Sequence, residues 1–339
     1  MTIVGAFDVH RAQITFDYLD GETGEVRTGR IVPADREQLR AWLERFEDRD
    51  DVAFAVEGCT GWRYVVDELR RAGIEAHLAE PADTASLRGS KRRAKTDKAD
   101  ARHLRQLLVD GRVPESWIPP AHVLDVRTLG RLYVDLMGES RSWQQRVRAQ
   151  LYHQGVPAQR LVFGAEGREE LARADLSPAG RQAVETGLTI IDGLVAQILP
   201  LRAQLGAFAR HQSGCRALMS LYGVGALTAP MIWAEMGDTR RFSSSRQAVR
   251  HTGVDITVWS SDGKRTRGHL ARQGPPALRW ALYEAAQSAA KKTSPDHAYY
   301  LEVRDRLGHN RACLSVVRKL ARQSHHILRD LGDEAWAAA

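Results

Sequence analysis

Two carboxylates inside a run of positive charge are the residues of this chain that most suggest chemistry. Asp97 and Asp100 lie three positions apart in the segment 93–102, which also holds four Lys and Arg side chains. Residues three apart share one face of a helix, so the two carboxylates can point toward the same place. Such a pair can hold a cation. Taken alone, however, an acidic first turn that complements the helix dipole is the plainer interpretation.

Two further acids stand where predicted strands end. Asp8 follows an apolar run that begins at Ile3, and Glu57 ends the run 52–56. An acid at the end of a buried strand is costly unless it is paired or metal-bound, although a single such acid is more often a turn residue. Four acids from two strand ends and one helix favour Mg²⁺ or Mn²⁺, which prefer oxygen ligands. A carboxylate cluster in a basic protein in turn favours phosphodiester chemistry.

The composition agrees with an anionic partner. The chain carries a net charge of +7 at pH 7 and has a sequence pI near 9.5, which favours nucleic acid. Its three cysteines lie far apart, which argues against a zinc site and a disulfide framework and favours a reducing cytoplasm. We find no apolar run of membrane-spanning length and no signal peptide, so we expect a cytoplasmic, nucleoid-associated protein without a membrane partner.

The elements that must position the four acids read as an α/β domain over residues 1–118. A helix is expected from Asp97, with Thr96 as its N-cap and Gly111 as its stop. Three strands followed by alternating helix and strand predict a mixed sheet. The expected strands are 3–10, 14–19, 26–32, 52–56 and 75–79, and the other helices are 36–46 and 62–72.

The rest of the chain reads as helical. Apolar residues recur at helical spacing from about 121 to 151 and again over 177–208, where Pro200 is expected to kink the helix. This predicts a helical hairpin or coiled coil over 119–212, whose apolar stripes would be core or dimer contact. A mainly α-helical domain is expected over 213–335. It ends in a single basic helix over 296–331 that carries His325 and His326 on its surface.

A glycine-rich, basic stretch over 252–279 contains two adjacent serines, Ser260 and Ser261. The plainer interpretation is a nucleic-acid-binding loop in which the serines only donate to phosphates. The sharper one makes a serine the nucleophile that forms a covalent phosphoserine with a DNA strand end. No His–Asp triad spacing is visible around the serines, so a metal held by the four acids could activate the hydroxyl.

Three motifs in one order carry a resemblance to a known family. They are Gly-x-Phe-Asp-Val-His at 5–10, Val-Glu-Gly-Cys-Thr-Gly at 56–61 and Lys-Thr-Asp-Lys-Ala-Asp-Ala at 95–101. The chain resembles the DEDD transposases of bacterial insertion sequences, the family numbered one hundred and ten. The resemblance implies a RuvC-like (RNase H-like) N-terminal domain, a coiled-coil connector that pairs protomers, and a C-terminal serine domain. It also implies that Asp8, Glu57, Asp97 and Asp100 form the catalytic, metal-binding tetrad.

The resemblance continues through the serine stretch. Counting from Gly253, the serine of the family falls on Ser261, and Ser260 remains the alternative. The stretch departs from the family pattern in three places: Ile256 replaces a proline, Asp262 follows Ser261 directly, and the turn at 271–274 lacks a serine. The resemblance implies a transposase or recombinase that uses a serine nucleophile together with the acids.

The partners expected from this resemblance are target and donor DNA, a structured guide RNA that pairs with both, and further copies of the chain, from dimer to tetramer. The nucleic-acid contacts are expected at Arg88, Lys91, Arg92, Arg93, Lys95, Lys264, Arg265, Arg267 and Arg272. A hydrolytic RuvC-like junction resolvase or nuclease is one alternative, against which the serine stretch speaks. A non-catalytic nucleic-acid-binding protein is the other, against which the four intact acids speak.

Overall fold

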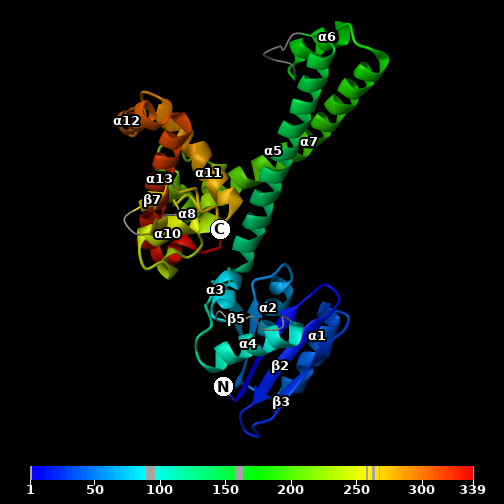
Figure 1. Cartoon of the computed structure of the whole chain (residues 1–339), viewed down its shortest axis with the longest axis vertical. Coiled ribbons are helices and arrows are strands. Elements are labelled where there is room, and N and C mark those ends of the chain that lie inside the picture. Colours follow the sequence, from blue (N-terminus) through cyan, green and yellow to red (C-terminus); the bar gives the residue numbers. More distant parts are fainter. Residues whose placement is uncertain are drawn as a thin grey trace. The chain divides into compact units, whose positions relative to one another are not determined.

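A computed structural model of the chain describes residues 2–338 except 89–95, 157–162, 257–258, 262–263 and 267. Of residues 259–261 and 264–266 it describes the backbone alone. The chain divides into two compact units, an N-terminal unit, Met1–Ile118, and a C-terminal unit, Pro119–Ala339 (Figure 1). The predicted connector over 119–212 and the predicted C-terminal domain therefore belong to one unit.

The N-terminal unit is built on a five-stranded mixed sheet with the strand order β3-β2-β1-β4-β5. β1 pairs antiparallel with β2, which pairs antiparallel with β3, whereas β4 runs parallel to both β1 and β5. The mixed sheet predicted from the sequence is confirmed. The strands are β1 (Ile3–Val9), β2 (Ile14–Asp20), β3 (Val26–Ile31), β4 (Val52–Glu57) and β5 (Glu75–Ala79).

An aromatic core fills one face of this sheet, beneath the helices α1 (Arg36–Leu43) and α2 (Trp62–Arg71). Phe7 stacks on Phe54 with ring centroids 4.7 Å apart, and Trp42 of α1 packs edge-on against both. Neighbouring residues of a strand point to opposite faces. Because Phe7 points into the aromatic core, the next residue along β1 is directed to the other face.

Small residues let the helix α4 (Asp97–Val109) approach that other face closely. Ala6, Ala55 and Ala79 come from three strands and are buried together with Leu104 of α4. Because alanine adds a single methyl group above the sheet, the helix axis can lie close to the strands. The first turn of α4, with its two acids, is thus held beside the ends of β1 and β4.

The sequence did not predict the short helix α3 (Pro81–Ser86). Pro81 ends β5, as expected, but it also occupies the first helical position, where its missing N–H is no loss. Glu80 caps the helix by accepting from the Asp83 N–H at 2.7 Å. Pro81, which the sequence indicates only as the end of a strand, therefore also begins a helix.

Two long antiparallel helices, α5 (Ala121–His153) and α7 (Pro178–His211), dominate the C-terminal unit (Figure 1). The buried apolar residues of α7 recur every seven positions, at 184, 191, 198 and 205. A Cβ on Gly187 would lie 2.5 Å from Val147 of α5, so this contact requires glycine. The two long helices were predicted. α7 runs through Pro200 without interruption.

α7 contains a long apolar run that was not expected from the sequence, for which no apolar run of membrane-spanning length was predicted. Over an 18-residue window α7 is long and apolar enough to cross a membrane by composition, and 22% of that window is buried. Val184 and Ile191 are buried in a cluster with residues of α5, whereas Val195 and Leu199 remain 39% and 57% exposed. α7 therefore carries apolar surface that α5 does not cover.

Shorter helices complete the C-terminal unit. They are α6 (Ala165–Arg173), α8 (Ser213–Leu218), α9 (Thr228–Met236), α10 (Ser245–His251), α11 (Pro276–Gln287), α12 (His297–Leu307) and α13 (His309–Leu331). The single helix predicted over 296–331 is wrong. Gly308, with φ +85°, separates α12 from α13 in a conformation that favours glycine. The expected surface position of His325 is also wrong, because this side chain is 2% exposed, whereas His326 is exposed.

Candidate metal centre and serine hairpin

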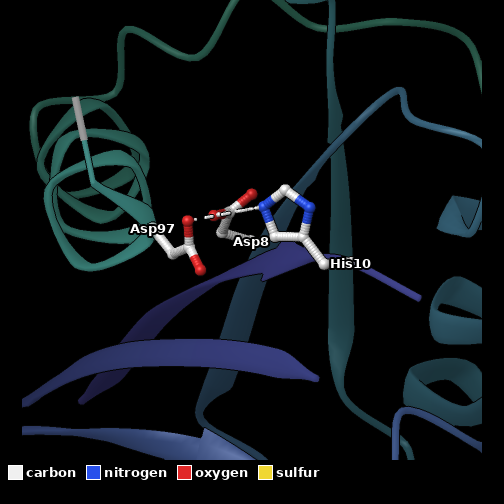
Figure 2. A group of neighbouring side chains, drawn as sticks. All are labelled: Asp8, His10 and Asp97. Carbon is white, nitrogen blue, oxygen red and sulfur yellow. Dashed lines mark hydrogen bonds and ion pairs between the residues drawn. The ribbon is translucent and has the colours of Figure 1, made fainter. Parts of the chain in front are cut away.

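Three side chains from two elements meet at the end of β1. Asp8 lies on this strand, His10 follows the strand, and Asp97 is the first residue of α4. His10 Nε2 lies 3.2 Å from Asp8 Oδ2 and 3.6 Å from Asp97 Oδ1 (Figure 2). The three residues offer ligand atoms that all lie within 4.8 Å of one another. This spacing suits a shared cation.

A second group adjoins the first through Asp8. A cavity of about 10 Å³ is lined by Asp8, Glu57 and Asp100 together with Arg88, Thr84, Phe7 and Leu104. That volume corresponds to about one water-sized sphere, so it suits a single ion or water. Arg88 Nη1 donates to Asp100 Oδ1 at 2.6 Å, which supplies one positive charge to the cavity.

The negative charges of this region are only partly compensated. Burial raises the pKa of Asp8, and the nearby charges of Asp97 and Asp100 raise it further, while His10 lowers it. A raised carboxyl pKa means that the ionised form is held at a cost. A divalent cation would remove that cost, and carboxylate oxygens are the donors that Mg²⁺ and Mn²⁺ prefer. The donor set therefore fits the metal that the tetrad implies.

Local contacts orient the first turn of α4. The Thr96 hydroxyl accepts from the Ala99 N–H at 3.2 Å, which confirms the predicted N-cap. Gln13 Nε2 donates to Asp97 Oδ2 at 2.9 Å. About two turns further along α4, Arg105 Nε donates at 2.5 Å to Asp17 of β2, and both side chains are buried. The helix that carries two acids is thus tied to the sheet by a buried ion pair.

The sequence motifs assigned no role to His10 or Gln13. His10 follows Asp8 by two positions, and alternate residues of an extended chain share a face, so the strand period could have identified it. Gln13 carries no such signal. It reaches Asp97 only because β2 folds back beside β1.

The predicted phosphate-binding residues of the N-terminal unit fall into two groups. Arg88 is described, and it lies in an ion pair with Asp100 rather than free in solvent. The other residues of this loop, Lys91, Arg92, Arg93 and Lys95, lie outside the described residues. They remain predictions.

The predicted nucleophile lies on a short two-stranded hairpin of the C-terminal unit. β6 (Trp259–Ser261) pairs antiparallel with β7 (Lys264–Thr266), so Ser261 is opposite Lys264 and Ser260 is opposite Arg265. The side chains of all four residues lie outside the described part of the chain, as does the whole of Arg267.

The base of this hairpin is described. A bridge between Ile256 and Leu270 closes it, and the Ala271 N–H donates to Asp255 O at 3.0 Å. Arg272, another predicted phosphate contact, is exposed and adopts φ +54°. Its N–H donates to Gly253 O at 3.0 Å. Backbone contacts thus fix the two chain segments that enter and leave the serine hairpin.

Two family descriptions match different parts of the chain. Residues 5–154 match the DEDD transposases of the IS110 group, and residues 215–301 match the transposase IS116/IS110/IS902 family. The first match contains all four acids, and the second contains both serines.

Individual relatives agree with these matches. The transposase for insertion sequence element IS1111A of Coxiella burnetii is 30% identical over 122 residues, which are 35% of this chain and 34% of the relative. The probable family 20 transposase of Pseudomonas aeruginosa is 24% identical over 70% of this chain and 71% of its own length. The putative transposase y4qE of Sinorhizobium fredii is 26% identical over 78% of this chain and 66% of its own length. The match thus spans about a third of the Coxiella protein and more of the other two. By the two family matches and these relatives, the chain belongs to the IS110 family of insertion-sequence transposases.

Proposed function

We propose that the chain is a DNA transposase that cuts DNA strands and rejoins them to new partners. Asp8, Glu57, Asp97 and Asp100 hold Mg²⁺ or Mn²⁺, and Ser261 is the nucleophile. The observation that carries the proposal is the pair of acid groups that share Asp8 at one edge of the sheet. The printed names of the relatives, which are transposases, support the same activity.

The carboxylates prepare this edge of the sheet for a phosphodiester. A bound Mg²⁺ would neutralise the acids and stabilise charge on the attacking and leaving oxygens. Asp8 belongs to both acid groups, so the chain offers ligands for adjacent cations. Arg88 holds Asp100 in place by a hydrogen bond and an ion pair. His10 and Gln13 hold Asp97 from the other side.

The serine step conserves the energy of the phosphodiester bond. A bond forms between Ser261 Oγ and phosphorus, and the phosphorus–oxygen bond to one strand end breaks. The serine proton passes through solvent to the departing hydroxyl. When the hydroxyl of another strand attacks the phosphoserine, the serine is released and the new strand is complete. Because an ester replaces an ester, rejoining needs no ATP, whereas attack by water would discard the bond energy.

The partners follow from this reaction. Exchange between target and donor DNA brings together two duplexes and favours a dimer or tetramer of the chain. Val195 and Leu199 of α7, and Leu132 of α5, are exposed apolar side chains on the long helices, where a coiled-coil contact between protomers would cover them. A structured guide RNA that pairs with both DNA molecules is part of the proposal because of the family resemblance.

The experiment that tests the proposal searches for the covalent intermediate. Wild-type protein is incubated with Mg²⁺, labelled donor and target DNA and the RNA transcribed from the flanking element, then denatured and separated by size. We expect a labelled protein–DNA adduct that Ser261→Ala removes and Ser260→Ala, the matched control one residue away, does not.

Other outcomes assign the chemistry differently. An adduct that survives Ser261→Ala and disappears in Ser260→Ala moves the nucleophile by one residue. Cleaved DNA without any adduct supports the hydrolytic nuclease instead. Failure of Asp97→Ala to reduce cleavage in Mg²⁺ means that the tetrad is wrong.

A further inference from the structure

Four arginines lie in a line on α13. Arg311, Arg318, Arg322 and Arg329 are separated by seven, four and seven residues. At 100° per residue these spacings keep all four within an arc of about 40°, over a length of about 27 Å. We call this set the arginine line.

The opposite side of α13 fixes the direction in which the arginine line points. The helix packs against α10, α11 and α12, and its apolar residues Val316, Leu320 and Leu328 are almost fully buried. Because the buried arc is fixed by this packing, the arginine line is directed to the surface of the C-terminal unit. Three of its members are exposed, and Arg318 is half-buried.

The charges of the arginine line are not balanced by carboxylates. α13 carries five Lys and Arg residues but a single acid, Asp330. Among the described residues, none of the four arginines forms an ion pair with a carboxylate within 4.0 Å, whereas the neighbouring Lys319 pairs with Asp296. A helix face that is simply solvated usually carries charges of both signs. This face carries one sign.

Hydrogen bonds hold two members of the line without neutralising them. Arg318 Nε donates to Val254 O at 3.0 Å, and Arg329 Nη1 donates to Phe242 O at 3.0 Å. Burial and the charge of Arg322 lower the pKa of Arg318, while Tyr299 and Asp255 raise it. Asp255 is thus an acid that lies near Arg318, and Arg250 Nε lies 3.8 Å from Asp255 Oδ2.

We propose that the arginine line binds the phosphate backbone of the DNA that reaches the serine hairpin. This inference rests on the proposed function. A DNA duplex rises about 3.4 Å per base pair along its axis, so the arginine line spans about 8 base-pair steps. Arginine binds phosphate in a bidentate manner and keeps its charge at any physiological pH. Arg318 donates to Val254 O, and Val254 lies in the segment that leads into β6. The arginine line therefore passes beside the base of the serine hairpin.

The test compares two double variants, each of which replaces two arginines by neutral glutamines. Arg311→Gln with Arg322→Gln removes the two exposed arginines whose side chains donate no hydrogen bond within the described part of the chain. Arg304→Gln with Arg306→Gln, on α12, removes two exposed arginines whose charges Asp305 and Glu302 already balance. All proteins carry Ser261→Ala, and the affinity for a DNA duplex of about 30 base pairs is measured against salt concentration.

We expect the first pair to reduce the slope of log affinity against log salt by about 1.8, because each lost phosphate contact contributes about 0.9. The α12 pair should leave the slope unchanged. Arg311→Lys with Arg322→Lys should retain most of it. If the double variant does not fold, as judged by circular dichroism, Arg322→Gln alone should reduce the slope by about 0.9.

Three results would overturn the inference. They are an unchanged slope in the Gln variants, an equal loss in the α12 control, and a loss with a structured RNA of equal length but not with DNA. Adduct formation by protein with an intact Ser261 is measured in parallel. An absent adduct ends the proposed serine chemistry, but it leaves the salt slope as a valid test of the arginine line.

Discussion

The acids of the N-terminal unit and the serines of the C-terminal unit are supported very differently. Asp8 and Glu57 end buried strands, and Asp97 and Asp100 begin a helix that lies on small residues and a buried ion pair. The serines lie on strands of three residues each, closed by one bridge and a few backbone bonds. A two-stranded hairpin of this size is marginal without support.

Electrostatics explains the difference. Bringing like charges together costs free energy, and the burial that raises the pKa of Asp8 adds to this cost. A rigid sheet and a docked helix can supply that free energy. A neutral serine imposes no comparable cost, so a small two-stranded hairpin is sufficient to hold it. The support around each group therefore scales with the charge that it must hold.

Removing one of the four acids should have the largest effect on activity. We expect Asp8→Asn to reduce strand cleavage by roughly a thousandfold or more, because metal coordination supplies several kcal/mol to phosphodiester chemistry. Asp110→Asn, an exposed acid at the other end of α4, is the matched control and should cleave normally. Cleavage is measured on labelled DNA in Mg²⁺.

The Asp8→Asn variant should be more stable than the wild type in metal-free buffer. The pKa of Asp8 is raised in the folded state, so folding favours the protonated form and stability is lost as pH rises through that pKa. At pH 7 the ionised carboxylate therefore destabilises the fold, and Asn removes this penalty. A melting temperature below that of the wild type without metal would show that Asp8 is structural instead.

The contacts that hold α4 on the sheet can be removed without changing the four acids themselves. Asp17→Asn leaves the buried Arg105 without its counter-charge, which costs about 3–5 kcal/mol of stability. We expect denaturant unfolding of the N-terminal unit to shift accordingly. Arg102→Gln, which removes an exposed and more distant partner of Asp17, should cost under about 1 kcal/mol. Equal effects would mean that the buried pair is not what fixes α4.

The sequence predicted the sheet and the position of each acid well, because strand ends and helix starts have local signals. Thr96 and the strand that ends at Glu57 were predicted from adjacent residues alone. Asp17 was not identified as important, because a single acid in a strand does not reveal an arginine 88 residues away.

The two errors in the last helices have different origins, one in the backbone and one in tertiary packing. The apolar pattern continues across Gly308, so it does not indicate the break between α12 and α13. The positive φ of Gly308 produces that break. His325 was predicted to lie on the surface together with His326, yet its ring packs beside Phe242, a contact made between distant segments. Side-chain partners across the chain decide such positions, and helical spacing does not report them.

The two units should also respond differently to acid. Burial, followed by the charge of Arg241, lowers the pKa of His251 from 6.5 to about 4. Its contribution to stability is therefore complete above pH 6.5 and is lost as pH falls toward 4. Burial lowers the pKa of His325 as well, so it acts in the same direction.

Hydrogen exchange, corrected for the intrinsic rate at each pH, measures this difference. We expect α10 and α13 to lose protection between pH 6.5 and 4, whereas the strand that carries Asp8 should not lose protection over that range. His251→Gln, which can still hydrogen-bond Glu235 O, should reduce the pH dependence. Parallel loss of protection in both units would contradict the assignment to the histidines.

The smallest effect is expected from the basic loop before α4. Neutralising Lys91 or Arg93 with Gln should lower the salt slope of DNA binding by about 0.9 each and weaken binding to all sequences alike. Arg88→Gln should change the slope less, because Asp100 already balances its charge. Instead it should alter the Mg²⁺ concentration needed for cleavage, since Asp100 loses its partner. If Arg88→Gln changes the salt slope as much as Lys91→Gln does, Arg88 contacts DNA and its pairing with Asp100 does not persist in the complex.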